Sequence, residues 1–255
     1  MKPVTGVGTL DKDFPEDKAC HSVSTVNVQL MLGQIYLNNG KFSDAFNMFE
    51  VAARSGDPRA LNMLGRAYER GWGVPCNASA AAMYFSHAAS MGEGWAMFNL
   101  ADLYLAGKGV KKDTQTAYNL YVMSAQHGVS KAFNMLGLII EDGLIPEIDR
   151  GKSIDFFRAA INSGDCWGYL NMARYHLLYG ERDAALMCLE GALDLGFEDV
   201  FQAIEKLFYG VEDARFCKIV ERAKEQKSAS SILVRVLRMH AGFEYYSCFN
   251  RVWFP

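Results

Sequence analysis

The chain has 255 residues, of which 50% are hydrophobic and 22% are charged, and its formal net charge is −3. This length and composition allow one or two domains with a sizeable apolar core, and they exclude a chain that is disordered throughout. The slight acidic excess is not typical of a nucleic-acid-binding protein, and no apolar run approaches the ~18 residues of a membrane-spanning helix. We therefore expect no nucleic-acid partner and no membrane insertion.

Residues 1–26 are mostly polar, and we expect them to form a flexible N-terminal arm. They contain no apolar stretch of the kind that a secretory signal requires, which predicts a cytoplasmic protein. The six cysteines are irregularly spaced, and this pattern favours free thiols in a reducing compartment over a disulfide framework.

A repeat becomes visible after the arm. Five glycines mark its units at spacings of 36, 36, 36 and 32 residues: Gly56, Gly92, Gly128, Gly164 and Gly196. A bulky residue precedes each glycine by seven positions: Phe49, Phe85, Tyr121, Phe157 and Leu189. Small residues precede each glycine by eleven and by four positions, and offsets of three and four residues place these columns on one face of an α-helix.

A second helical pattern stands before the first one in every unit. Its central position is small, directly after a bulky residue, and is occupied by Gly33, Gly65, Ala101, Gly137 and Ala173. Each unit is therefore predicted to be a pair of helices, A and B, that approach closely at the small residue. The longer units hold their four extra residues between the two helices, where glycine and proline indicate loops at 71–75, 107–111 and 143–146.

These motifs resemble the Sel-one-like repeat family, a relative of tetratricopeptide repeats. The resemblance rests on small-Leu-Gly-x-x-Tyr, Gly-x-Gly-Val and the alanine columns, and it covers about residues 27–199. It implies an all-α fold, namely a right-handed α/α superhelical solenoid of about five helix-turn-helix repeats with the A helices on the concave face. One helical pair cannot bury its apolar face alone, whereas stacked pairs can.

Residues 200–240 keep a helical pattern without the repeat columns and are predicted to form two or three C-terminal capping helices. Residues 241–255 form a tail rich in aromatic side chains. Three interpretations of this tail remain open: it packs back onto the capping helices, it docks a partner, or it is an unstructured extension.

The resemblance also indicates where a ligand would bind, because three A-helix positions per tetratricopeptide-like unit face the concave groove. These positions stand six and three residues before the small residue and one residue after it. The candidate partner-binding residues at these positions are Arg59, Asn62, Arg66, Trp95, Phe98, Asp102, Lys131, Asn134, Trp167 and Arg174. Trp and Arg are enriched at binding hot spots, and by the resemblance Asn62 and Asn134 would hold the backbone of an extended peptide. The alternative is that both tryptophans pack between adjacent A helices and that the arginines are only solvated.

No motif points to catalysis. The five histidines are scattered, and the sequence has neither a Cys-x-x-Cys pair nor a glycine loop suited to phosphate. We therefore predict no catalytic residue, no cofactor and no metal site, and we expect a non-catalytic scaffold or adaptor that binds a peptide or protein. The alternative is a secreted or periplasmic repeat protein that takes part in host interaction, neutralises a toxin or is β-lactamase-like.

Overall fold

The computed structural model describes the backbone of residues 24–241 and the side chains of residues 24–228. This part of the chain is helical throughout and contains no strand. The odd-numbered helices are α1 (Thr25–Asn38), α3 (Pro58–Arg70), α5 (Gly94–Ala106), α7 (Lys131–Glu141), α9 (Cys166–Leu178) and α11 (Glu198–Leu207). The even-numbered helices are α2 (Phe42–Ala53), α4 (Ala78–Ser90), α6 (Thr114–Gln126), α8 (Ser153–Asn162), α10 (Arg182–Leu195) and α12 (Ala214–Ala241), and a 3₁₀ turn, η1 (Arg150–Lys152), precedes α8.

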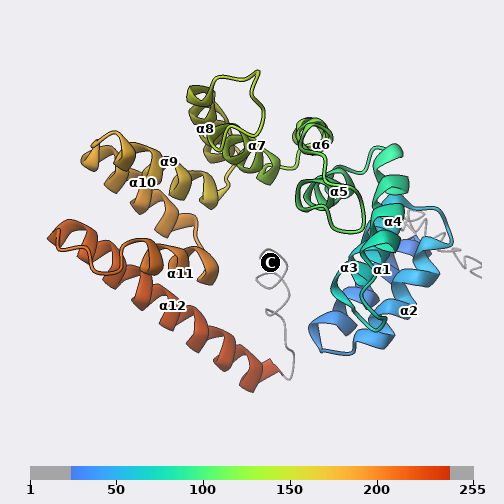
Figure 1. The fold of residues 1–255 in the computed structure, drawn as a ribbon. Coiled ribbons are helices and arrows are strands. Elements are labelled where there is room, and N and C mark those ends of the chain that lie inside the picture. The colour runs from blue at the N-terminus through green and yellow to red at the C-terminus, as the bar shows by residue number, and fades with distance from the viewer. Residues whose placement is uncertain (1–23, 242–255) are drawn as a thin grey trace, which may run out of the picture.

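Each odd-numbered helix packs against the even-numbered helix that follows it, and each pair packs against the next. The pairs form an arc around a central hollow (Figure 1). The predicted all-α solenoid of paired helices is confirmed. In the segment predicted to form two or three capping helices, α11 and α12 pack against each other and against α9 and α10. Most of the predicted N-terminal arm and the aromatic tail after Ala241 lie outside the described residues.

Close packing within a pair depends on the small residue of the A helix. A Cβ atom added at the glycine of α1, α3 or α7 would lie 2.4, 2.7 and 2.4 Å from a phenylalanine ring of the B helix. The three contacts join Gly33 to Phe49, Gly65 to Phe85 and Gly137 to Phe157. All three phenylalanines are 0% exposed, so the missing side chain makes room for a large, fully buried ring in each pair.

Two of the three longer loops between A and B helices have the predicted four extra residues. Residues 39–41 join α1 to α2, whereas residues 71–77 and 107–113 form longer connections, and the third connection, 142–152, is longer still and contains η1. Gly109 has a φ of +71°, and a Cβ atom placed there would lie 2.3 Å from the carbonyl carbon of Ala78. The loop backbone therefore rests directly on the start of α4 in the preceding pair, and the Ser79 hydroxyl strengthens this contact by donating to the Gly109 carbonyl at 3.1 Å.

Polar side chains set the starts of the helices. The N-cap side chain accepts a hydrogen bond from the first turn of its helix at Asp57, Asn77, Glu93, Asp113 and Asp165. These caps satisfy backbone N–H groups that have no partner within the helix. The capping side chains thus determine the residue at which the A helices α3, α5 and α9 begin.

Candidate binding groove

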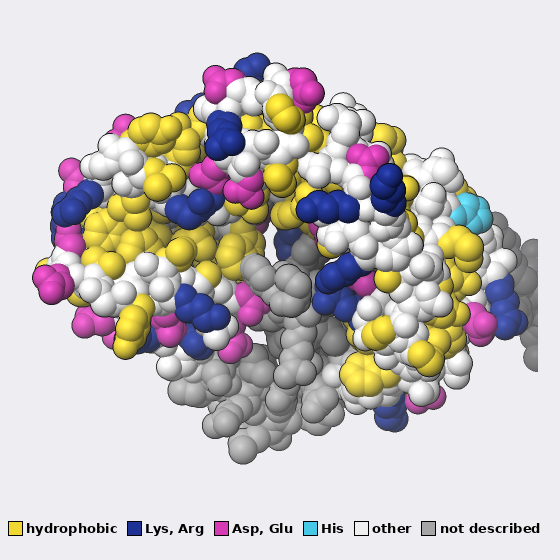
Figure 2. Space-filling view, in the orientation of Figure 1, with side chains coloured by type: hydrophobic (Ala, Val, Ile, Leu, Met, Phe, Trp, Pro, Cys, Tyr) yellow, Lys and Arg dark blue, Asp and Glu magenta, His cyan; other side chains and the backbone are white. Residues whose placement is uncertain are grey.

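The odd-numbered helices lie on the inner side of the arc. In Figure 1, α3, α5 and α7 are nearer to the central hollow than their partners α4, α6 and α8. Odd-numbered helices also contact one another across units, since α3 packs on α5, α7 on α9 and α9 on α11. Figure 2 shows the hollow with Lys and Arg side chains on both sides of it. The A helices therefore carry the inner surface, which is where the candidate residues were predicted to lie.

Arg59 stands at the N-terminal end of this surface, in the first turn of α3. Its side chain is 56% exposed and forms an ion pair with Asp57 at 2.7 Å. The same guanidinium donates to Asn27 Oδ1 of α1 at 2.9 Å. The hydrogen bond with Arg59 lowers the pKa of Asp57, and it raises the pKa of Arg59 in turn. Arg59 is thus an exposed cation whose position is fixed by two helices.

Asn62 and Asn134 are buried between A helices, with exposed fractions of 7% and 8%. Asn99 Nδ2 donates to Asn62 Oδ1 at 2.9 Å, and Asn171 Nδ2 donates to Asn134 Oδ1 at 2.8 Å. These bonds join α3 to α5 and α7 to α9. The position three residues before the small residue faces the next A helix more than the groove, so the role of both amides in holding a peptide stays a prediction.

Trp95 is the most exposed of the candidate aromatic residues, with 39% of its surface accessible. Its ring meets Phe98 edge to face with 6.0 Å between the centroids, and Phe98 meets Tyr121 in the same way at 5.3 Å. Phe98 is 2% exposed and Tyr121 is 0% exposed. Phe98 was predicted to face the groove but belongs to the core, where it supports the indole of Trp95 from behind.

Asp102 also belongs to this cluster, because its carboxylate accepts a hydrogen bond from the Tyr121 hydroxyl. Burial raises the pKa of Asp102 to about 7, although the bond from Tyr121 acts in the opposite direction. Burial and the neighbouring carboxylate raise the pKa of Tyr121 as well. The predicted groove residue Asp102 therefore provides the acceptor for the hydroxyl of the fully buried Tyr121.

Lys131 and Asp165 form a second charged group, at the starts of α7 and α9. Burial lowers the pKa of Lys131 to about 8, and the charge of Asp165 opposes this shift. Asp165 is 5% exposed, and burial raises its pKa, while one of its oxygens accepts from the backbone N–H of Trp167 at 3.2 Å. Lys131 is thus a partly buried cation in the middle of the array.

The remaining three candidates lie on α3 and α9. The guanidinium of Arg66 lies over the Trp72 ring, 5.2 Å from its centroid. The Trp167 ring meets Phe197, which directly precedes α11, at a centroid distance of 6.4 Å. Arg174 forms an ion pair with Glu141 of α7. Trp167 therefore packs toward the next unit, as the alternative interpretation of the tryptophans expects, and Arg174 joins two A helices.

Sequence reasoning missed the partners of these residues. Asn99 and Asn171 each stand 37 positions after the asparagine that they contact, one position away from the 36-residue register. The two asparagine pairs share this spacing of 37 residues, which is a signal in the sequence that could have identified the partners. Glu141, which was not among the candidate residues, pairs with Arg174.

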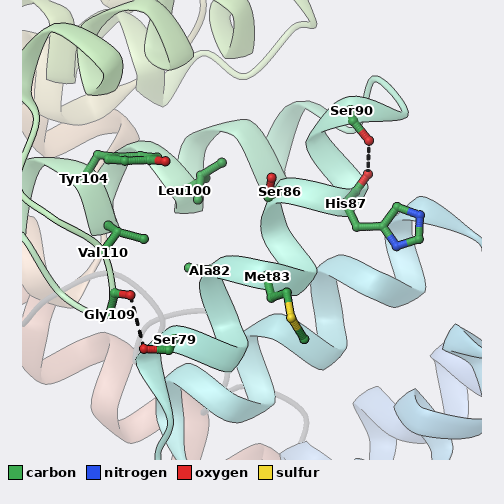
Figure 3. A pocket seen from close by; sticks show the side chains of 10 residues that line it. All are labelled: Ser79, Ala82, Met83, Ser86, His87, Ser90, Leu100, Tyr104, Gly109 and Val110. Atoms are coloured by element: carbon green, nitrogen blue, oxygen red, sulfur yellow. Dashed lines mark hydrogen bonds between the residues drawn. The ribbon is translucent and has the colours of Figure 1, made fainter.

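Among residues 24–228, no three His, Cys, Asp or Glu side chains gather in a way that could hold a metal ion. A cavity of about 500 Å³ lies between α4, α5 and the loop at Gly109 (Figure 3). Its Ser90 hydroxyl donates to the carbonyl of His87 at 2.7 Å rather than to the imidazole. No helix between residues 24 and 241 is both long and apolar enough to cross a bilayer.

Comparison with known proteins agrees with the helical pairs. A family model described as Sel1 repeat matches residues 58–93, 96–129 and 130–165. The first and third stretches each cover an A helix and the B helix that follows it, and the second begins within α5 and runs beyond α6. The four described cysteines, at 76, 166, 188 and 217, are free.

Several solved structures share the fold. A Sel1 repeat protein from Oxalobacter formigenes is 22% identical with a TM-score of 0.64, and the match covers 82% of this chain and 88% of that chain. The antigen c5321 of uropathogenic Escherichia coli, which displays an SLR fold, is 23% identical with a TM-score of 0.60, and the match covers 86% of this chain but only 50% of that chain. The immunity protein Pa5087 from Pseudomonas aeruginosa is 13% identical with a TM-score of 0.60, and the match covers 82% and 83% of the two chains.

Proposed function

Since residues 58–165 of this chain are Sel1 repeats within a longer α-solenoid, we propose that the protein is a non-catalytic scaffold that binds a protein or peptide along its inner face. Stacked helical pairs create an extended curved surface, and repeat proteins of this architecture use such surfaces for binding. The same proposal places the protein in the cytoplasm, and the four free cysteines among the described residues support that location.

The exposed indole of Trp95 is the observation that carries this proposal. Trp95 is 39% exposed on an inner helix, whereas Phe98 and Tyr121 beneath it are buried. A large aromatic ring on a rigid base loses little conformational entropy when a ligand covers it, which is why such rings dominate binding energies. Lys131 and Arg59, at the starts of α7 and α3, add cationic groups that would suit a partner segment with acidic and apolar side chains.

The test compares Trp95→Ala with Met83→Ala in the full chain. Met83 is 66% exposed on α4, which lies on the outer side, so this variant removes a similar apolar side chain away from the groove. A partner is first isolated from the native organism with the unaltered protein, and its affinity for each variant is then measured by calorimetry. We expect Trp95→Ala to weaken binding at least ~10-fold and Met83→Ala to leave it unchanged.

Two controls make this result decisive. Circular dichroism and urea unfolding establish that both variants keep their helices and their stability. If the partner bound Trp95→Ala and the unaltered chain with equal affinity, the proposed binding at the inner face would be wrong. Stronger weakening by Met83→Ala would move the binding surface to the outer helices.

The alternative function, neutralisation of a toxin, stays a prediction and also requires binding of a protein. Immunity proteins from Pseudomonas aeruginosa share the fold at 13% identity, a level at which the likeness concerns the fold alone. Such a role would also need a protein partner on the solenoid surface. The calorimetric comparison of Trp95→Ala with Met83→Ala therefore tests it equally well once a candidate toxin is at hand.

A further inference from the structure

Two of the loops between A and B helices cover the helical pair that precedes them. A Cβ atom added at Gly73 would lie 2.5 Å from the carbonyl oxygen of Phe42, and one added at Gly109 would lie 2.3 Å from the carbonyl carbon of Ala78. The backbone of each of these loops therefore rests on the start of the preceding B helix. This contact closes the edge of the array at the starts of α2 and α4.

The loop between α11 and α12 has the same local sequence but not the same contact. Residues 209–211 are Tyr-Gly-Val, which repeats the glycine–valine step of 72–74 and 108–110, and Gly210 has a φ of +77°. This loop has six residues, whereas the two earlier loops have seven. A Cβ atom added at Gly210 would meet no heavy atom of the described residues within 4 Å. The loop therefore stands away from the preceding pair and leaves this part of the edge open.

A cavity of about 750 Å³ lies at this loop, where the α9–α10 and α11–α12 helices adjoin one another at the left of Figure 1. Its apolar lining consists of Leu177, Leu207, Phe208, Val211 and Phe216. The rings of Phe208 and Phe216 are buried and stack with 5.2 Å between their centroids. Arg182, Glu212 and Asp213 supply the charged part of the lining, and Arg182 forms an ion pair with Asp213 at 3.6 Å. An aromatic ring that carries a hydroxyl group matches this chemistry, because the ring packs on the apolar side chains and the hydroxyl donates to a carboxylate.

Exposed apolar side chains surround the cavity. Their exposed fractions are 91% for Tyr209, 71% for Leu178, 65% for Tyr179, 51% for Leu207 and 37% for Val211. At the usual sizes of these side chains, they present about 500–600 Å² of apolar surface, which is the upper end of what a monomer exposes and marks an interaction site. Two such surfaces placed face to face would bury about 1,000–1,200 Å², which is enough for a weak and reversible dimer.

We propose that two copies of the chain associate through this edge, with Tyr209 of each copy inserted into the cavity of the other. The projecting ring and the cavity are neighbours on one surface, because Tyr209 stands between Phe208 and Val211, which both line the cavity. A surface that carries both a projection and its matching cavity is self-complementary, so a two-fold axis forms both contacts at once and closes the assembly at two copies. The lining also offers both signs of charge, at Arg182 and Glu212, so a cation of one copy can meet a carboxylate of the other.

Sedimentation velocity of the full chain tests this association without any partner. Between about 1 and about 200 μM, we expect the unaltered chain to show a monomer–dimer equilibrium with a Kd of about 10–100 μM, as suits an interface of this size. Tyr209→Ser removes both inserted rings of the dimer at once. If each ring contributes about tenfold, the Kd rises at least ~100-fold. Met83→Ser is the control, because Met83 is 66% exposed on α4, far from the cavity, and this variant should associate like the unaltered chain.

A second variant distinguishes reciprocal insertion from general stickiness. Val211→Glu keeps Tyr209 but places a carboxylate in the apolar lining beside Glu212. Either variant alone lacks both contacts, because one has no projecting ring and the other has no open cavity. A mixture of Tyr209→Ser with Val211→Glu retains one of the two contacts, so its mixed dimer should be about tenfold tighter than the dimer of either variant alone. Circular dichroism and urea unfolding establish that both variants remain folded.

Three results would overturn the inference. The first is an unaltered chain that stays monomeric at the highest concentration. The second is a Tyr209→Ser chain that associates as well as the unaltered one, or no better than Met83→Ser, since the contact would then lie on another surface. The third is a mixture of Tyr209→Ser and Val211→Glu that associates no more tightly than either variant alone. The inference goes beyond the proposed function and does not depend on it: Trp95→Ala should form dimers like the unaltered chain, whatever its affinity for a partner.

Discussion

Replacing Gly137 by Ala places two physical effects in opposition within one pair of helices. Alanine is a better helix former than glycine by ~1 kcal/mol, which alone would stabilise α7. The added Cβ, however, would lie 2.4 Å from Cε1 and 2.6 Å from Cδ1 of Phe157. Comfortable carbon–carbon contacts are about 3.5–4.0 Å, so the ring must move by more than ~1 Å.

The ring of Phe157 cannot move without displacing its neighbours, because it is 0% exposed and packed in the interior of the pair. Overpacking of such a core costs ~1–3 kcal/mol and, where backbone has to shift, more. Setting this cost against the gain in helix propensity, we expect Gly137→Ala to lower the free energy of unfolding by about 1–2 kcal/mol. Urea unfolding followed by circular dichroism measures this as a lower midpoint at an unchanged slope.

A second substitution in the same pair should relieve the clash. In the α9–α10 pair, Ala173 stands at the glycine position and the fully buried Leu189 stands at the phenylalanine position. The double variant Gly137→Ala/Phe157→Leu copies this natural combination, and we expect it to lose about 1–2 kcal/mol less than the sum of the single variants. Ala173→Gly is the matched control and should lose ~1 kcal/mol of helix propensity. A midpoint for Gly137→Ala above that of the unaltered chain would refute the packing argument.

Three further substitutions test other contacts. Gly109→Ala should destabilise the protein by at least ~1 kcal/mol in urea unfolding, because its φ of +71° disfavours a side chain and its Cβ would meet the backbone of Ala78 at 2.3 Å. Asn62→Ala should lose ~1 kcal/mol, and a double-mutant cycle with Asn99→Ala should recover this as coupling between α3 and α5. Burial raises the pKa of Asp102 from 3.8 to about 7, so the folded protein holds a proton that the unfolded chain releases, and the free energy of unfolding falls as the pH rises from about 4 to about 7. Asp102→Asn removes this titration, so its free energy of unfolding should fall by ~1–3 kcal/mol less than that of the unaltered protein between about pH 5 and about pH 8. An equal fall in both proteins would contradict the buried position of the carboxyl group.

The fold was predictable because similar residue types recur at the positions where the two helices of each pair touch. Small residues recur where an A helix and its B helix touch, and the glycine at 33, 65 or 137 proved to lie under a phenylalanine ring. The spacing between columns also located the longer loops. The last two helices were predicted as capping helices and not as a further repeat, because α11 and α12 bury Phe201, Ile204 and Phe216 without the small-residue columns of the earlier units.

The candidate site was predicted less well, for a geometric reason. Counting from the small residue treats each A helix as an isolated cylinder with one exposed inner face. From α3 to α9, successive A helices lie so close together that the position three residues before the small residue is covered by its neighbour, whereas Leu30 of α1 is only partly buried. Asn62, Phe98, Asn134 and Leu170 occupy this position, and none of them is more than 8% exposed. The position six residues before the small residue stays more accessible, as the 39% exposure of Trp95 and the 56% exposed side chain of Arg59 show.

Differences between repeats carry information that the shared columns do not. Among the five bulky B-helix residues, one is a tyrosine, at position 121, and one acidic residue follows a small A-helix residue, at position 102 of the same unit. A buried hydroxyl needs an acceptor, so this joint exception alone would have predicted the hydrogen bond that the structure shows. Residues that share a column can also differ in their contacts. Trp95 and Trp167 stand at the same position of their units, but Trp167 meets Phe197 before α11, whereas Trp95 keeps 39% of its surface exposed and is the stronger candidate for binding.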